Sequence, residues 1–192
     1  NNTTGTANVA VGMCALYSNT TATGNTAVGF AALRATTTSS RNSAFGKNSL
    51  CSNTTGADNT AGGMNSLVSN TTGDYNVALG YGALDSVTTS DSNTAVGYRA
   101  GASVTTGEGN VLLGEGAGTT TVGLTTGSGN VVLGQDARTN AVGDNYTITI
   151  GVNATGKGNS TGFISPNGGN MYQGSNSANW STVSDRRIKK NI

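Results

Sequence analysis

The chain repeats one short pattern with a 17-residue period, and this period restricts the folds that are open to it. Eight repeats each hold an Asn followed four positions later by a Gly, in cores such as NTAVG and NVALG. The first seven pairs keep one spacing, and the eighth follows after a slightly longer step. A fixed period of this kind indicates a stacked-repeat architecture. The pairs consist of Asn8, Asn25, Asn42, Asn59, Asn76, Asn93, Asn110 and Asn130 with Gly12, Gly29, Gly46, Gly63, Gly80, Gly97, Gly114 and Gly134.

The repeat is too short for helical units, because helix–turn–helix repeats need about 30 residues or more. Thr, Val and Ala alternate around each Asn, and TTG or GxGN sequences break the chain between them. These patterns favour short strands joined by tight turns. The sequence therefore predicts an all-β repeat solenoid, a parallel β-roll with one 17-residue coil per repeat, over residues 1–140. Each coil should rise by one strand spacing of about 4.8 Å.

Stacking places each residue above its own copy in the next coil, which assigns roles to the repeated positions. The Asn side chains are expected to form an amide ladder along the stack. The Gly is expected to supply a positive φ, or a close backbone approach that a Cβ would block. A small residue and usually Leu follow at the third and fourth positions after the Gly, until Gly101, Gly118 and Arg138 replace the Leu.

The two residues before the Gly should point to opposite faces, because strand side chains alternate. The residue directly before the Gly is apolar in seven repeats and is predicted to fill the lumen: Val11, Val28, Phe45, Leu79, Val96, Leu113 and Leu133, with Gly62 as the exception. The residue two before the Gly is predicted to line a subunit interface: Ala10, Ala27, Ala44, Ala61, Ala78 and Ala95. Compositional drift is the alternative explanation for this Ala strip.

A thin roll of Ala, Val and one Leu per coil buries little apolar surface by itself. Burial is worth roughly 25 cal/mol per Å², against a backbone entropy of about 1–2 kcal/mol per residue. Packing three rolls together would bury a second face and protect strand edges. A closely packed or intertwined homotrimer is therefore expected.

The composition argues against several functional classes. The chain has no His and only two Glu, so we expect no metal site, no cofactor and no general enzyme activity. Four of the ten basic residues lie in the last seven positions, and no basic stripe precedes them, which argues against nucleic-acid binding. No apolar run long enough to insert into a membrane is present. Cys14 and Cys51 lie two repeats apart in different phases, so no disulfide is expected between them.

The N-x-A-x-G-x-x-A-L pattern resembles the head repeats of trimeric autotransporter adhesins of the YadA type, over about residues 5–140. The resemblance implies a left-handed parallel β-roll in a tight trimer. The period of this chain exceeds the usual adhesin coil, which implies an extra turn or a longer outer strand.

The chain ends in SDRRIKKNI, residues 184–192, which resembles the opening of the endosialidase-type intramolecular chaperone domain, also called the peptidase S74 family. Such domains trimerise the protein upstream and then cut themselves off. The resemblance implies that Ser184 is the nucleophile, that Lys189 is its general base, and that cleavage falls between Ser184 and Asp185. The alternative for this segment is a solvated basic tail.

Residues 141–183 break the period and are predicted to form a capping and linking β region, starting with a longer strand in NYTITIG. Four aromatic residues lie there: Tyr146, Phe163, Tyr172 and Trp180. They are expected to pack in the core or an interface, and a carbohydrate-binding patch is the functional alternative.

The combined features favour a trimeric phage tail-fibre or tail-spike segment, located on the virion, that acts as a shaft and recognises the host. A bacterial cell-surface adhesin fibre of the same architecture is the alternative. Host glycans or an outer-membrane receptor are the expected partners, bound near Asp58, Asp74, Tyr75, Asp91 and the longer coil at residues 118–126. A polysaccharide depolymerase would need paired carboxylates, for which Glu108 and Glu115 are the candidates.

Overall fold

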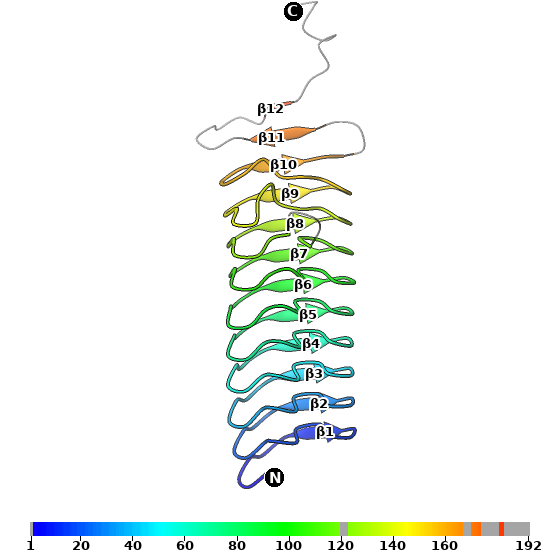
Figure 1. Cartoon of the computed structure of the whole chain (residues 1–192), viewed down its shortest axis with the longest axis vertical. Coiled ribbons are helices and arrows are strands. Elements are labelled where there is room, and N and C mark those ends of the chain that lie inside the picture. Colours follow the sequence, from blue (N-terminus) through cyan, green and yellow to red (C-terminus); the bar gives the residue numbers. More distant parts are fainter. Residues whose placement is uncertain (1, 120–122, 167–169, 174–180, 183–192) are drawn as a thin grey trace, which may run out of the picture.

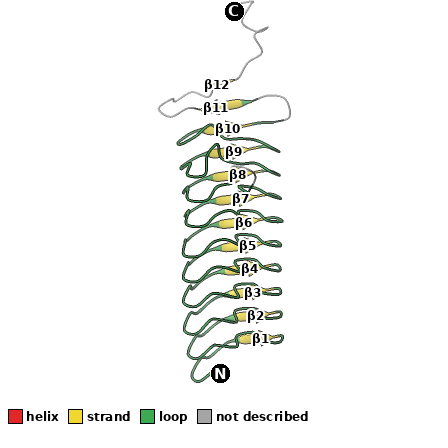
Figure 2. Cartoon of the chain, in the orientation of Figure 1, coloured by secondary structure: helices red, strands yellow, loops and turns green. Residues whose placement is uncertain are grey.

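A computed structural model describes residues 2–119, 123–166, 170–173 and 181–182 of the chain. Its described residues contain strands, turns and bends and no helix (Figure 2). The strands follow one another in a single 12-stranded sheet in chain order. They are β1 Val9–Val11, β2 Thr26–Val28, β3 Ser43–Phe45, β4 Thr60–Gly62, β5 Val77–Leu79, β6 Thr94–Val96, β7 Val111–Leu113, β8 Val131–Leu133, β9 Ile148–Ile150, β10 Gly162–Ile164, β11 Met171–Gln173 and β12 Ser181–Thr182.

The first ten strands are parallel, and each pairs with the next in the register that the repeat predicts. Ala27 lies beside Ala44, Ala44 beside Ala61, and Ala61 beside Ala78. Figure 1 shows the coils piled into a straight column with the sheet along one side. The predicted all-β parallel solenoid is therefore confirmed.

The regular stack continues past residue 140, where the sequence indicated a change. Thr147 takes the place of the repeated Asn and Gly151 takes the place of the repeated Gly, so β9 is an ordinary short strand like those before it and not a longer one. β10 also pairs in parallel, and only β11 and β12 run antiparallel. Regular coils therefore continue into the region that the sequence assigned to a cap, and the hydroxyl of Thr147 donates to Oδ1 of Asn130 at 2.9 Å.

The inside and the outside of the roll are the reverse of the prediction. The Ala strip is in the lumen, where Ala27, Ala44 and Ala61 are fully buried, and it forms no subunit interface. The column before the Gly faces outward, with Val11 56% and Phe45 48% exposed. In β2 to β6 the sheet contributes only Ala to the lumen and leaves the space to residues from the opposite wall, whereas β7, β8 and β10 contribute Leu112, Val132 and Phe163.

Leucines from that opposite wall fill the lumen. Their φ angles lie between 49° and 51°, in the left-handed region, and they are buried: Leu16, Leu33, Leu50, Leu67 and Leu84. A left-handed non-Gly residue costs about 1–3 kcal/mol, and burying a Leu contributes about 1.5–3 kcal/mol. In the coils up to β5 the core is this Leu column packed against the Ala column of the sheet, and further along the stack it includes Leu112 and Val132 from the sheet itself.

The predicted amide ladder is confirmed. The backbone N–H of Asn76 donates to Oδ1 of Asn59 at 2.9 Å, and Oδ1 of Asn76 accepts from the N–H of Asn93 at 3.0 Å. Nδ2 of Asn76 donates to the carbonyl oxygen of Ser90 at 2.8 Å. The same link from side-chain oxygen to the next backbone N–H continues from Asn8 up to Thr147. Each coil is thereby pinned to its neighbours through buried amides.

The repeated Gly allows the close approach that was expected. Gly46 has a φ of 132°, and a Cβ on it would lie 2.7 Å from both the carbonyl carbon and the carbonyl oxygen of Gly63. Real Cβ atoms do not approach backbone this closely, so any side chain here would push two coils apart.

The last described residue of the buried core along the chain is an aromatic one. Phe163 on β10 is 4% exposed, and the ammonium of Lys157 lies 4.8 Å from the centre of its ring. Phe163 therefore packs in the core, as one of the two sequence interpretations expected, whereas Tyr146 is 70% exposed. The side chain of Tyr172 and all of Trp180 lie outside the described residues.

Candidate binding surfaces

The residues predicted to carry self-cleavage are not part of the described structure. Ser184, Asp185 and Lys189 all lie in the segment 183–192, outside the described residues. Residues 120–122 of the longer coil lie outside it as well. The binding surfaces must therefore be built from the coils themselves.

Two of the turn aspartates predicted to bind ligand are used to hold coils together. Oδ1 of Asp74 accepts the backbone N–H of Ala57 at 2.6 Å, and Oδ1 of Asp91 accepts the N–H of Asp74 at 2.7 Å. Tyr75 lies at the same corner and is 61% exposed. These carboxylates continue a second ladder along the turn that precedes each strand, and only their outer oxygens remain available.

Asp58 forms an ion pair across two coils. Its Oδ1 and Oδ2 accept from Nε and Nη2 of Arg41 at 2.6 Å and 2.7 Å. This bidentate hydrogen bond, with burial opposing it, lowers the pKa of Asp58 and raises the pKa of Arg41. The Arg41 side chain is 66% exposed, so solvent screens the pair and its contribution to stability is small.

We expect Arg41→Ala to raise the pKa of Asp58 towards the ordinary carboxyl value, measured by NMR titration of the side-chain carboxyl carbon. The pKa of Asp58 is depressed in the folded protein, so the contribution of the pair to stability is present above the unfolded pKa. It is lost as the pH falls through the folded pKa. Arg34→Ala, which removes an exposed arginine of the neighbouring wall, should leave the titration of Asp58 unchanged. An unchanged Asp58 pKa in Arg41→Ala would contradict the assignment.

The two glutamates are not arranged as a glycosidase pair. Glu108 lies in the turn before β7 and Glu115 directly after Gly114 at the other end of the strand. The segment 110–114 that separates these turns spans about 16 Å at roughly 3.3 Å per residue. Paired glycosidase carboxyl groups are only about 5–9.5 Å apart. Among the described residues there is also no cluster of His, Cys, Asp or Glu suited to a metal ion.

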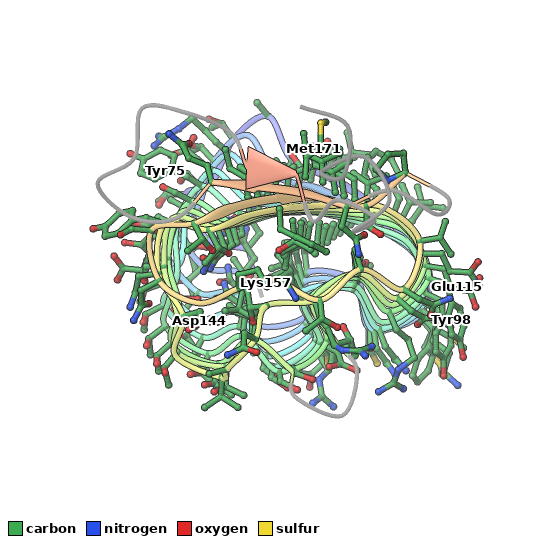
Figure 3. The ribbon with its side chains drawn as sticks, turned by 90° about the horizontal axis from the view of Figure 1, so that it is seen from above. Tyr75, Tyr98, Glu115, Asp144, Lys157 and Met171 are labelled. Carbon is green, nitrogen blue, oxygen red and sulfur yellow. The ribbon has the colours of Figure 1, made fainter. Side chains whose placement is uncertain are left out.

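The outward face of the sheet is an exposed surface without charge. From β1 to β9 its side chains are Val, Thr, Ser, Phe, Gly, Leu or Ile. Exposed members include Val9 49%, Val11 56%, Phe45 48%, Leu79 41%, Val96 38%, Leu113 37% and Ile148 41%. Met171 of β11 extends the same face in Figure 3. We call this surface the sheet face.

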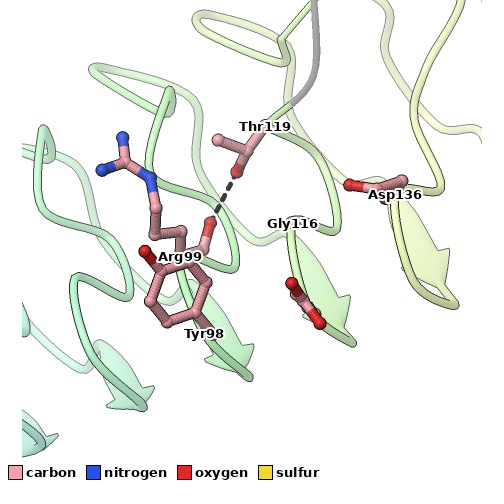
Figure 4. A pocket seen from close by; sticks show the side chains of 6 residues that line it. Tyr98, Arg99, Gly116, Thr119 and Asp136 are labelled. Carbon is pink, nitrogen blue, oxygen red and sulfur yellow. Dashed lines mark hydrogen bonds between the residues drawn. The ribbon is translucent and has the colours of Figure 1, made fainter.

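A pocket lies round the corner from the sheet face. It has a volume of about 180 Å³ and is lined by Tyr98, Arg99, Glu115, Gly116, Thr119 and Asp136 (Figure 4). Thr119 closes one side, because its hydroxyl donates to the carbonyl oxygen of Arg99 at 2.7 Å and accepts the N–H of Ala102 at 3.0 Å. A second hollow, lined by Tyr17, Ser18, Arg34 and Ala35, lies near the N-terminal end of the stack.

This pocket was not predicted from the sequence, although its signals are in the repeat. Tyr81 and Tyr98 share one phase in successive coils, and their rings stack with centroids 5.3 Å apart at an angle of 12°. Gly116 lies in the next phase, which holds Asn48, Asn65 and Arg99 in other coils, all with positive φ. A Gly in a column of side chains leaves a gap, which a period-by-period alignment could have shown.

The described residues define the protein as a single parallel β-solenoid. Both cysteines are free thiols. No described segment forms a helix of the length and hydropathy needed to cross a membrane. The chain matches no family model, no curated protein and no solved structure in comparisons with known proteins.

Proposed function

We propose that the chain is a segment of a trimeric fibre of the phage tail-fibre type, in which the solenoid is the shaft and its outer corners contact the host. The observation that carries this proposal is the sheet face. It is free of charged side chains along nine strands, whereas the other walls carry the Arg, Lys, Asp and Glu residues of the described coils. A depletion of charge is the composition that marks the buried centre of protein interfaces.

Three copies around an axis parallel to the solenoid would bury this face. Equivalent coils of the three chains would then lie at the same height along the axis. In such a closed symmetric trimer the sheet face of each chain contacts the same coils of the neighbouring chains. No sheet face is left over to bind a further copy. The nine rows span about 40 Å at roughly 4.8 Å per coil. The proposed interface is thus the Val, Leu and Phe column before the Gly, in place of the Ala strip that the sequence pattern favoured.

The proposal includes recognition and maturation. The corners of the coils remain free when the sheet face is buried, and a host-surface glycan or an outer-membrane receptor is the proposed partner there. The resemblance of residues 184–192 to the start of an S74 chaperone supports assembly of the trimer by a C-terminal domain that releases itself through Ser184 and Lys189. A bacterial adhesin fibre would bury the same face and differ only in where the fibre is anchored.

We expect the purified chain to have the mass of three copies by light scattering, and the double variant Leu79→Asp with Val96→Asp to have the mass of one. Both side chains are about 40% exposed on the sheet face, so their replacement places six carboxylates at the centre of the trimer. Desolvating unpaired carboxylates costs several kcal/mol each. The control is Tyr75→Asp, which is exposed on another wall and shares its phase and positive φ with Asp58. A monomeric wild type, or a double variant that stays trimeric, would sink the proposal.

A further inference from the structure

We propose that the pocket between Tyr98 and Asp136 binds a single neutral pyranose ring of a surface glycan. This inference deepens the proposed function and rests on it for the biological source of the ligand. The pocket occupies one corner of three successive coils, those of β6, β7 and β8. Figure 3 places Tyr98 and Glu115 at the side of the coil, away from the outward face of the sheet. Burial of the sheet face therefore leaves the pocket open.

The pocket is a gap in a ladder of side chains. Arg99, which directly follows Tyr98, shares its repeat position with Gly116 and Asp136 in the next two coils. Gly116 therefore lies between two residues that carry side chains. Arg99 and Asp136 are two coils apart, a separation of about 10 Å at roughly 4.8 Å per strand spacing. Gly82 is the other Gly at this repeat position, and the pocket opens at Gly116, where the gap between Arg99 and Asp136 leaves room for a ligand.

The carboxylate of Asp136 leans into this slot. A Cβ on Gly116 would lie 2.5 Å from Oδ1 of Asp136, so the glycine leaves the space that the carboxylate occupies. Arg99 leans towards its own preceding coil, where its Cγ would lie 3.6 Å from a Cβ on Gly82, and Figure 4 shows its guanidinium pointing away from Gly116. The accessible polar atoms beside Gly116 are therefore mainly acceptors from Asp136 and Glu115.

Tyr98 supplies a wall that is fixed before any ligand arrives. Its ring is stacked on Tyr81, and the backbone around it is tied by the bonds from the N–H of Gly116 to the carbonyl of Tyr98 at 2.9 Å and from the N–H of Asp136 to the carbonyl of Glu115 at 2.8 Å. Preorganised walls reduce the entropy that binding must overcome. An aromatic face beside fixed acceptors suits a ligand with a C–H face and an edge of hydroxyls.

The charges in the pocket decide between ligand classes. Within the described residues the carboxylates of Glu115 and Asp136 accept no hydrogen bond and form no ion pair. With Arg99 the pocket carries one positive and two negative groups, which disfavours an anionic sugar. Hydroxyl groups of a neutral pyranose can donate to both carboxylates in charge-assisted hydrogen bonds. The alternative ligand, an organic cation, becomes an outcome of the test.

The test uses the whole chain and ligand-observed saturation-transfer NMR with methyl α-D-glucopyranoside, methyl β-D-galactopyranoside and methyl α-D-mannopyranoside, and with tetramethylammonium as the cationic probe. We expect at least one glycoside to bind with a millimolar dissociation constant. Gly116→Asn fills the slot, and Asn48 and Asn65 occupy the same phase at φ of 58° and 59°, so this variant should fold. It should weaken binding by roughly tenfold or more, a change of about 1.4 kcal/mol.

Two further variants and one control complete the experiment. Tyr98→Ala should also weaken binding by roughly tenfold, because it removes the stacking wall. Asp136→Asn, which keeps the shape and removes the charged acceptor, should weaken binding less. Phe30→Ala removes an exposed aromatic side chain at the equivalent position four coils earlier and should change nothing. Light scattering on each sample reports the oligomeric state separately.

The outcomes are distinguishable. If a trimeric, folded wild type binds none of the glycosides, or if Gly116→Asn binds them unchanged, the inference fails and the proposed fibre stands. If tetramethylammonium binds and loses affinity in Gly116→Asn while the glycosides do not bind, the pocket is a cation site and the inference fails. If the wild type is a monomer whose pocket still binds a glycoside, the sugar site stands and the proposed fibre fails.

Discussion

Asn76→Ala is expected to destabilise the chain by about 3 kcal/mol or more, a large share of a typical stability of about 5–15 kcal/mol. The substitution removes the acceptor of the Asn93 N–H and the donor to the Ser90 carbonyl, both at fully or nearly fully buried residues. Each buried polar group without a partner costs about 1–3 kcal/mol. The loss of stability is large because every coil is held only by contacts with its two neighbours, and this substitution weakens both of them.

Urea unfolding followed by far-UV circular dichroism measures this effect. The matched control is Asn65→Ala, since Asn65 is only partly buried and Ala31 occupies the same phase at a φ of 56° in an earlier coil. We expect this control to lose less than about 1 kcal/mol, as surface substitutions do. Equal unfolding free energies for Asn76→Ala and Asn65→Ala would mean that the buried amide ladder does not hold the stack together.

Leu112→Ala is expected to cost about 2–5 kcal/mol, and a second substitution at Gly101 should recover part of it. Leu112 lies on the sheet where earlier coils have Ala, and it is fully buried. In the same part of the stack the Leu column of the opposite wall becomes Gly101 and Gly118. A Cβ on Gly101 would lie 2.6 Å from Cδ1 of Leu112, so one large side chain from the sheet replaces the large side chains from the facing wall.

The rescue is the double variant Leu112→Ala with Gly101→Leu, which restores the arrangement of the earlier coils. Gly101 has a φ of 64°, and leucines of the same column have φ near 50°, so the backbone accepts the new residue. Gly101→Leu alone should destabilise the protein by overpacking, typically by about 1–3 kcal/mol. A favourable coupling energy in a double-mutant cycle of urea unfolding tests the exchange. Additive losses in the double variant would contradict it.

The pocket shows how far the candidate site could be foreseen. Period alone places Tyr81 over Tyr98 and leaves Gly116 between Arg99 and Asp136, and both are visible once repeats are written beneath one another. The repeat pattern does not reveal that the carboxylate of Asp136 lies over Gly116. The turn aspartates were placed at the correct corner, but their use in bonding the next coil depends on distances between coils.

The sequence by itself determined the parallel stack, its register, the amide ladder and the Gly column, because all four follow from a fixed period in which identical residues lie above one another. Only the tertiary structure decided which face of the strand is inside. Alternation along so short a strand shows that two faces exist but not which of them is buried. The apolar Val, Leu and Phe column suggested that its own face is buried, and this was wrong. The choice is made across the coil, where leucines with left-handed backbone reach into a lumen so narrow that the sheet opposite them can supply only Ala. The larger apolar residues of the strands are thereby left on the outer face.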